Sequence, residues 1–250
     1  MTMGSVWNHC TLVLHPSFQG LEAFMQSLPE RFERGEGILI HDGRNQLRRI
    51  PYQGTEYVVK SFRRPIFINR WVYGTLRPSK ALRSYQNALA LQRIGVGTPQ
   101  PVGYMNLRSG VLFDRSYFVT VASACPYRYE DLFTQEFPYQ EEVLRAIART
   151  TARLHEHGMA HKDYGRANIL FRQLPDGPVQ IEIVDLNRMA LGPLDVKAGC
   201  KNFERLPATP EMHRVLADEY AKARGFDARQ CYELMQAYRS VQPGKIDNLY

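Results

Sequence analysis

The sequence lacks the features that mark several classes of protein. None of its 250 residues belongs to a run approaching the ~20 apolar residues needed to span a bilayer. The stretch 1–15 lacks the basic start and apolar core of a signal peptide. The cysteines are few, far apart and without a C-x-x-C pair: Cys10, Cys125, Cys200 and Cys231. These absences argue against a zinc ribbon, a redox motif and a disulfide scaffold, and they favour a reducing, cytoplasmic compartment.

Acidic residues are missing from the whole stretch 57–113. The formal net charge of the chain is +7, and this stretch concentrates basic residues: Lys60, Arg63, Arg64, Arg70, Arg77, Lys80, Arg83, Arg93 and Arg108. Such a one-sided stretch projects a positive field that attracts phosphate, nucleic acid or an anionic membrane. From charge alone, a solvated basic face is the simpler interpretation.

The patterns that are present predict a strand-rich first part and a helical second part. Apolar or β-branched runs predict strands at 37–40, 56–62 and 117–121. A 3.6-residue period predicts helices over 79–94 and 141–157, the second with acids in its first turn and two histidines in its last. Helix starts are also predicted at Thr209-Pro210 and at Asp227. We therefore expect an α+β fold with an N-terminal lobe over 1–121 and a C-terminal lobe over 122–250.

One predicted hairpin interrupts the helical part. Ile169-Leu170-Phe171 is a short apolar strand, 175–177 is a turn signal, and apolar residues alternate over 179–183. A hairpin brings its two open ends together, so Asn168 and Asp185 should meet in space. Asp163, on the loop that enters the same end, should join them.

These three side chains suit a metal-dependent phosphoryl transfer. Carboxylate and amide oxygens are ligands that Mg²⁺ prefers, which predicts a metal held by Asn168 and Asp185. A second carboxylate, Asp163, would position and deprotonate the attacking hydroxyl. His161, Asp163 and Asn168 have the offsets of a kinase catalytic loop. Each residue alone could be an ordinary cap or loop residue, but the joint pattern is specific.

Lys60 is an independent fourth candidate. It shares a strand face with Val58 and Phe62, an unusual place for an ammonium group unless it reaches a partner. A lysine that extends from an edge strand to solvent is the alternative. Beside the other three residues, it is typical of a strand lysine that binds nucleotide phosphates.

Several motifs together resemble the lipopolysaccharide kinase (Kdo/WaaP) family of the protein-kinase-like superfamily. They are Val58-Val59-Lys60, the helix start 79–85, Thr98-Pro99-Gln100-Pro101, His161-Lys162-Asp163 with Asn168, and 185–189 (Asp-Leu-Asn-Arg-Met). The resemblance runs from about Gly37 to Gly225. It implies a protein-kinase-like bilobal fold, ATP and Mg²⁺ as cofactors, and a lipid-linked sugar acceptor, Kdo or heptose, in the lipopolysaccharide inner core. It also implies work at the cytoplasmic face of the inner membrane.

The proposed mechanism gives further residues a place in the site. Backbone groups of Val121 and Ser123 would contact adenine. Lys162, Arg166 or Arg188 would meet an anionic acceptor. Arg44, in the loop 41–46, would bind phosphate in place of a glycine-rich loop, because that loop has a single glycine.

Other departures from kinase patterns keep alternatives open. The helix over 79–94 contains no acid, so the usual lysine–glutamate pair cannot form there. Ser84 stands at the glutamate position, and Gln86 or a distant carboxylate is the alternative partner for Lys60. An atypical protein kinase and a membrane-bound pseudokinase that acts as a binding module are the competing functions. The oligomeric state is not predicted.

The segment 63–73 mixes basic residues with Ile, Phe, Trp and Tyr. This composition is typical of a segment that lies on an anionic membrane surface, although a packed insertion is an equal alternative. Nucleic acid is disfavoured as a partner because no nucleic-acid-binding motif accompanies the basic residues.

Membrane docking by this segment is directly testable. Replacing Arg63, Arg64 and Arg70 with Glu should abolish cosedimentation with anionic liposomes, because each cation near such a surface contributes about 1 kcal/mol. Unchanged cosedimentation of the folded variant would contradict the hypothesis.

Overall fold

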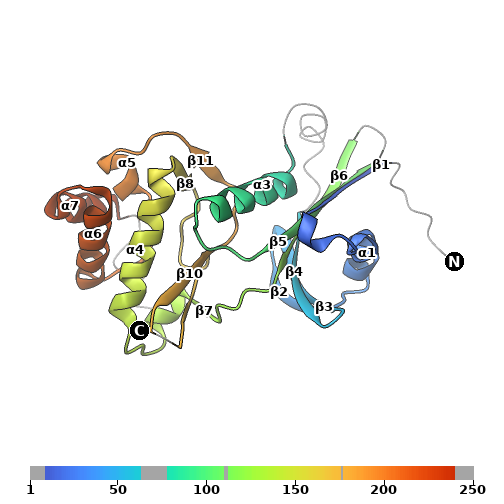
Figure 1. Ribbon diagram of the computed structural model, residues 1–250, viewed down its shortest axis with the longest axis horizontal. Coiled ribbons are helices and arrows are strands. Elements are labelled where there is room, and N and C mark those ends of the chain that lie inside the picture. The colour runs from blue at the N-terminus through green and yellow to red at the C-terminus, as the bar shows by residue number, and fades with distance from the viewer. Residues whose placement is uncertain (1–8, 63–77, 110–111, 176, 240–250) are drawn as a thin grey trace. The chain divides into compact units, whose positions relative to one another are not determined.

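The computed structural model describes residues 9–62, 78–109, 112–175 and 177–239, so the segment 63–73 lies outside the described residues. The chain forms two compact units (Figure 1). The first comprises Met1–Leu89 and Pro99–Ala122, and the second comprises Ala90–Thr98 and Ser123–Tyr250. The α+β class is confirmed. No helix in the described ranges is long and apolar enough to cross a bilayer.

The first unit is built on a six-stranded antiparallel sheet in the order β1-β5-β6-β4-β3-β2. Its strands are β1 (His9–Leu14), β2 (Ile38–Asp42), β3 (Asn45–Tyr52), β4 (Thr55–Phe62), β5 (Pro101–Ser109) and β6 (Leu112–Val121). The predicted strands are confirmed as β2, β4 and β6, whereas β1, β3 and β5 were not predicted. Strand β5 begins at a proline, which a first strand position tolerates.

Helix α1 (Glu22–Glu33) covers one face of this sheet. It follows the short 3-10 helix η1 (Pro16–Phe18). Phe24 and Leu28 are fully buried and pack in one cluster with Val59 of β4. Alternate residues of a strand point to opposite faces, so Lys60 lies on the other face.

Helix α3 (Lys80–Arg93) packs on that other face through its first half. Ala81 and Tyr85 cluster with Phe62 of β4. Ser79 caps the helix, since its Oγ accepts the N–H of Leu82 at 3.0 Å. The helix over 79–94 is thus confirmed.

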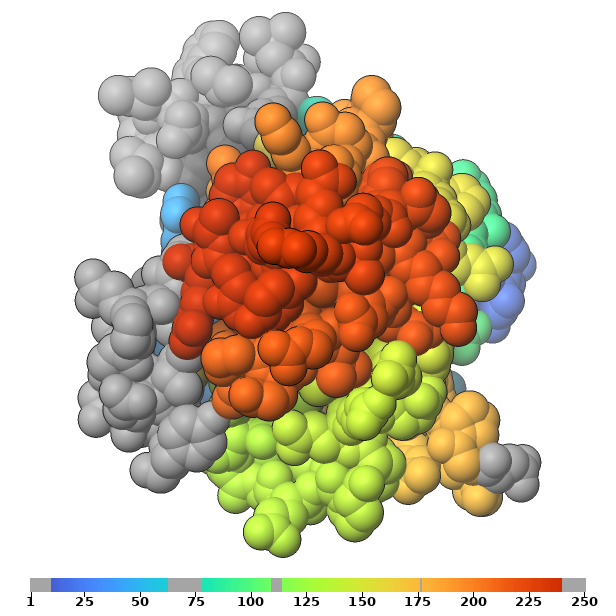
Figure 2. Space-filling model, turned by 90° about the vertical axis from the view of Figure 1, so that its left-hand side faces the viewer, coloured from blue at the N-terminus to red at the C-terminus, as the bar shows by residue number. Residues whose placement is uncertain are grey.

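The second unit contains the remaining elements. Its helices are η2 (Tyr129–Phe133), α4 (Gln140–Glu156), α5 (Val196–Lys201), α6 (Pro210–Arg224) and α7 (Ala228–Tyr238). Its strands are β7 (Tyr127–Arg128), β8 (Met159–His161), β9 (Ile169–Gln173), β10 (Val179–Ile183) and β11 (Met189–Leu191). The red and orange surface in Figure 2 belongs largely to α6 and α7. Both predicted caps are confirmed: the side chains of Thr209 and Asp227 accept backbone N–H groups of Met212 and Gln230.

The predicted hairpin is confirmed as the antiparallel pair β9–β10, with Ile169 opposite Ile183. The segment that follows α3 holds the end of β10. Ile183 donates its N–H to the carbonyl of Gly97 at 2.9 Å, and Thr98 Oγ1 donates to the carbonyl of Ile183 at 2.8 Å. A Cβ at position 97 would lie 2.0 Å from the carbonyl oxygen of Ile181, so only glycine permits this close approach.

Candidate active site

The open end of the β9–β10 hairpin brings two of the predicted site residues together. Past the last ladder pair, Val184 donates its N–H to the carbonyl of Asn168 at 3.0 Å. Asn168 Nδ2 then donates to the carbonyl of Asp163 at 2.8 Å. Because this bond fixes the amide with its nitrogen toward Asp163, the Asn168 Oδ1 atom is the one suited to a cation.

His161 connects the catalytic loop, residues 161–168, to Asp185, which lies just past the end of β10. Its Nε2 atom lies 3.1 Å from the carbonyl oxygens of both Val184 and Asp185, and its Nδ1 atom accepts the N–H of Asp163 at 3.1 Å. This bonding assigns the proton to Nε2. Burial lowers the pKa of His161, so the ring serves as a neutral connector.

Asp185 has a backbone conformation that is uncommon for a residue with a side chain. Its φ angle is +60°, in the left-handed region, which aspartate tolerates better than most residues. Asn187, itself buried, donates from Nδ2 to Asp185 Oδ1. The residue at the position of the usual kinase glycine therefore orients the predicted metal ligand.

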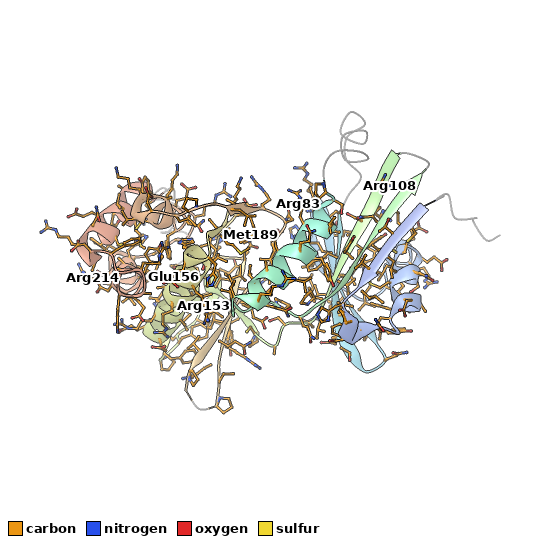
Figure 3. The ribbon with its side chains drawn as sticks, turned by 45° about the horizontal axis from the view of Figure 1, so that its top comes forward. Arg83, Arg108, Arg153, Glu156, Met189 and Arg214 are labelled. Atoms are coloured by element: carbon orange, nitrogen blue, oxygen red, sulfur yellow. The ribbon has the colours of Figure 1, made fainter. Side chains whose placement is uncertain are left out.

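The Asp163 carboxylate is bound by two arginines. Arg188 Nη1 lies 3.0 Å from Oδ1 and 3.1 Å from Oδ2, and Arg205 Nη1 lies 2.9 Å from Oδ1. Arg188 directly precedes β11 of the β8–β11 pair, and just past the last ladder pair Lys162 N–H donates to the carbonyl of Arg188 at 2.9 Å. Figure 3 marks Met189, the β11 residue that follows Arg188. Sequence reasoning missed Arg205, which is a single loop residue with no motif around it.

Hydrogen bonds among buried and half-buried side chains connect the catalytic loop to helices α4 and α6. Asn202 Nδ2 donates to the carbonyl of His161 at 2.8 Å, and His155 Nε2 lies 2.9 Å from Asn202 Oδ1. The Tyr220 hydroxyl lies 2.8 Å from His155 Nδ1. Burial lowers the pKa of His155 to about 4, so it is neutral at pH 7. A neutral His155 therefore adds no positive charge at the C-terminal end of α4.

Lys60, Arg44 and Val121 belong to the first unit, so their contact with the catalytic loop stays a prediction. Lys60 Nζ lies 5.5 Å from the centroid of the Phe62 ring. Ser84, at the usual glutamate position, donates its hydroxyl to the Lys80 carbonyl within its own helix at 2.9 Å.

Some of the polar groups predicted to contact the nucleotide at the end of β6 already form hydrogen bonds within the protein. Val121 donates its N–H to the carbonyl of Gln100 at 2.9 Å, so a nucleotide contact there would use its carbonyl oxygen. Ser123 Oγ donates to Glu182 Oε2 at 2.5 Å, and it accepts the N–H of Cys125 at 2.9 Å. Arg44 is exposed in the β2–β3 turn.

The other predicted acceptor residues lie on the surface of the second unit. Lys162 is exposed and directly precedes Asp163. Arg166 Nε lies 3.5 Å from Glu130 Oε2. Arg166 therefore points to a different carboxylate from the one that Arg188 binds.

The donor set at the hairpin mouth fits Mg²⁺. It offers one amide oxygen, from Asn168, and one carboxylate, from Asp185. Mg²⁺ is usually held by one or two carboxylates together with water and substrate phosphates, rather than by a cage of protein ligands. The described ranges contain no group of three His, Cys, Asp or Glu residues that could hold a metal.

A strand-rich first unit, a helical second unit and this catalytic loop define a protein-kinase-like fold. Residues 39–238 match the family model described as "Lipopolysaccharide kinase (Kdo/WaaP) family". The chain belongs to the lipopolysaccharide kinase (Kdo/WaaP) family, and it is an ATP-dependent phosphotransferase. No match was found among curated proteins.

Many solved structures have a similar fold, and two of them are compared with this chain. One, described as "WaaP in complex with acyl carrier protein", has a TM-score of 0.65 and 17% identity, covering 96% of this chain and 99% of that chain. The other is the Rio2 kinase–ADP/Mg²⁺–phosphoaspartate complex from Chaetomium thermophilum. Its TM-score is 0.50 with 16% identity, covering 91% of this chain and 74% of that chain. The predicted protein-kinase-like fold is confirmed.

Neutral His155 makes the stability of the second unit depend on pH. The unfolded chain binds a proton at this ring below about pH 6.5, whereas the folded chain does so only near pH 4. Stability is therefore complete above pH 6.5 and falls as the pH falls toward 4. Between pH 7 and pH 5, the loss from this residue should be about 2 kcal/mol. It is measured as the part of the wild-type pH 7–5 difference in urea-unfolding free energy that His155→Gln lacks, because buried His213, whose pKa is also lowered to about 4, adds to the total.

A His155→Gln variant should show a smaller difference, since glutamine takes no proton in this range. His157→Gln, an exposed change in the same helix end, should leave the wild-type difference unchanged. An equal pH dependence in the wild type and in His155→Gln would contradict this assignment.

Proposed function

We propose that this kinase transfers the γ-phosphoryl group of ATP to a sugar hydroxyl, of Kdo or heptose, in the lipopolysaccharide inner core. The observation that supports the reaction is a pair of hydrogen bonds, from Val184 N–H to the Asn168 carbonyl and from Asn168 Nδ2 to the Asp163 carbonyl, which connect the two segments that carry Asp163, Asn168 and Asp185. Family membership supports the sugar acceptor.

In this proposal Asp163 receives the proton of the acceptor hydroxyl. The hydroxyl oxygen forms a bond to the γ-phosphorus as the bond from that phosphorus to the β–γ bridging oxygen breaks, and ADP leaves. Asn168 Oδ1 and the Asp185 carboxylate would hold Mg²⁺, which when bound neutralises charge on the phosphates. Lys60 would bind the phosphates, and Ser123 and the Val121 carbonyl would contact the base.

The proposed acceptor also implies where in the cell the enzyme works. A lipid-linked sugar is reached at a membrane surface, and we assign that docking to the basic and aromatic segment 63–73, at the cytoplasmic face of the inner membrane. The composition of the segment supports this assignment. The liposome experiment given for this segment tests it independently of catalysis.

Removal of the Asp163 carboxylate tests the proposed reaction. Asp163→Asn keeps the shape of the side chain but cannot take the proton, so transfer to inner-core lipopolysaccharide should fall roughly 10³-fold or more. The measurement is incorporation of labelled phosphate from γ-labelled ATP into purified glycolipid.

Asp227→Asn is the matched control, because asparagine caps the N-terminus of α7 as well as aspartate does. It should keep the wild-type rate. Wild-type transfer by folded Asp163→Asn protein would refute the role of Asp163. Label on protein rather than on glycolipid would favour a protein kinase, and no ATP turnover by the wild type would favour a binding module.

A further inference from the structure

The two arginines on Asp163 place more positive than negative charge at the catalytic carboxylate. Arg188 and Arg205 each donate from Nη1 to Asp163, and their side chains are 56% and 53% exposed. The carboxylate between them is 22% exposed. One anion thus faces two cations, and in the described part of the chain only the Nη1 nitrogen of each guanidinium is hydrogen-bonded.

Arg188 and Arg205 lie on two backbone segments, each fixed by its own set of contacts. Arg188 precedes β11 and is fixed by the pairing of that strand with β8. Arg205 lies between Phe203 and Leu206, each 1% exposed, and Leu206 donates its N–H to the carbonyl of Phe203 at 2.9 Å. Two separate segments therefore deliver arginines to one carboxylate, so their convergence is a property of the fold.

The Phe203 ring fixes this loop against the catalytic loop. It packs edge-on against buried Tyr164, with the ring centroids 6.2 Å apart and an interplanar angle of 89°. A Cβ at Gly165 would lie 3.9 Å from the carbonyl oxygen of Arg205, so the two backbones run close together. Arg205 is therefore held beside the residue that would meet the acceptor hydroxyl.

The guanidinium contacts of Asp163 take up three of the about four acceptor sites of its carboxylate. Both of its oxygens accept guanidinium N–H groups, whereas a hydroxyl that gives up its proton must reach one of them. An arginine that leaves the Asp163 carboxylate needs another anionic partner. A guanidinium stays charged, and its planar fork matches the geometry of a carboxylate or phosphate. A neutral acceptor offers no such partner.

We propose that Arg188 and Arg205 form a binding site for a carboxylate or phosphate group of the acceptor, adjacent to the hydroxyl that is phosphorylated. The inference rests on the proposed function and narrows its substrate to sugars that carry, or directly adjoin, an anionic group. The two arginines are specificity-determining residues, and they exchange Asp163 for the acceptor's anion when the hydroxyl binds.

The nucleotide is the other possible source of an anion. The proposed function already assigns its phosphates to Asn168, Asp185 and Lys60, and it assigns Asp163, which both arginines bind, to the acceptor hydroxyl. We therefore assign the arginines to the acceptor, and the experiment separates the two sources.

Titration calorimetry without turnover tests the site. The ligands are the methyl glycoside of the acid sugar Kdo and its neutral methyl ester, with MgADP in a separate titration. Wild-type protein should bind the acid at least about 10-fold more tightly than the ester, as expected for charge-assisted hydrogen bonds. In Arg188→Gln/Arg205→Gln this preference should fall to about 2-fold or less, with the affinity for MgADP unchanged.

Two further variants sharpen the result. Arg188→Lys/Arg205→Lys should keep part of the preference, because the charges remain while the forked geometry is lost. Arg229→Gln removes an exposed arginine that lies 2.9 Å from Glu233, far from Asp163 in the sequence, and should keep the full preference. Circular dichroism and thermal melting confirm that each variant is folded.

Several results would overturn the proposal. These are an ester that binds wild-type protein as tightly as the acid, no measurable binding of the acid, or a preference that persists in the double glutamine variant. A weakened affinity for MgADP in that variant would assign the arginines to the nucleotide instead. Because the experiment needs no turnover, a wild-type protein that prefers the acid but phosphorylates no sugar would reject the proposed function alone.

Discussion

The site depends on the register of one hairpin. With Ile169 opposite Ile183, the next backbone bond joins Val184 to Asn168, and Asn168 in turn holds Asp163. A slip of one residue would turn every side chain of the strand to the other face and separate this amide from Asp185. Gly97 and Thr98 fix the end of β10 from its other side, so the register is held by bonds from two segments.

Neutral and largely buried side chains connect the catalytic loop to the helices of the second unit by hydrogen bonds. His161 and His155 each use both ring nitrogens, and Asn202 joins them. Buried polar groups are costly unless every member is satisfied, and a satisfied chain of this kind specifies one arrangement. The catalytic loop is therefore held from behind by uncharged contacts, while the charges gather at its exposed face on Asp163 and its two arginines.

The sequence predicted the parts of the fold that rest on periodicity or on turn chemistry. The hairpin, helices α3 and α4, and the caps at Thr209 and Asp227 followed from such patterns. Helix α1, which contains Pro29, carries a signal against its own structure that tertiary packing overrides. Within the proposed site, Asp163 and Asn168 were predicted from their offsets and Asp185 from the hairpin, and their roles stay predictions. Arg205 and Asn202 were not predicted, because they act from a loop whose return to the catalytic loop depends on the burial of Phe203.

The central claim is that Asn168 and Asp185 hold the metal while Asp163 serves the acceptor. Electron paramagnetic resonance of Mn²⁺, in place of Mg²⁺, with ADP measures this division of roles directly. We expect wild-type protein and Asp163→Asn to bind Mn²⁺–ADP with similar affinity, whereas Asn168→Ala and Asp185→Asn should each weaken this binding about 10-fold or more. Equal Mn²⁺–ADP binding by the wild type, Asn168→Ala and Asp185→Asn would contradict this division of roles.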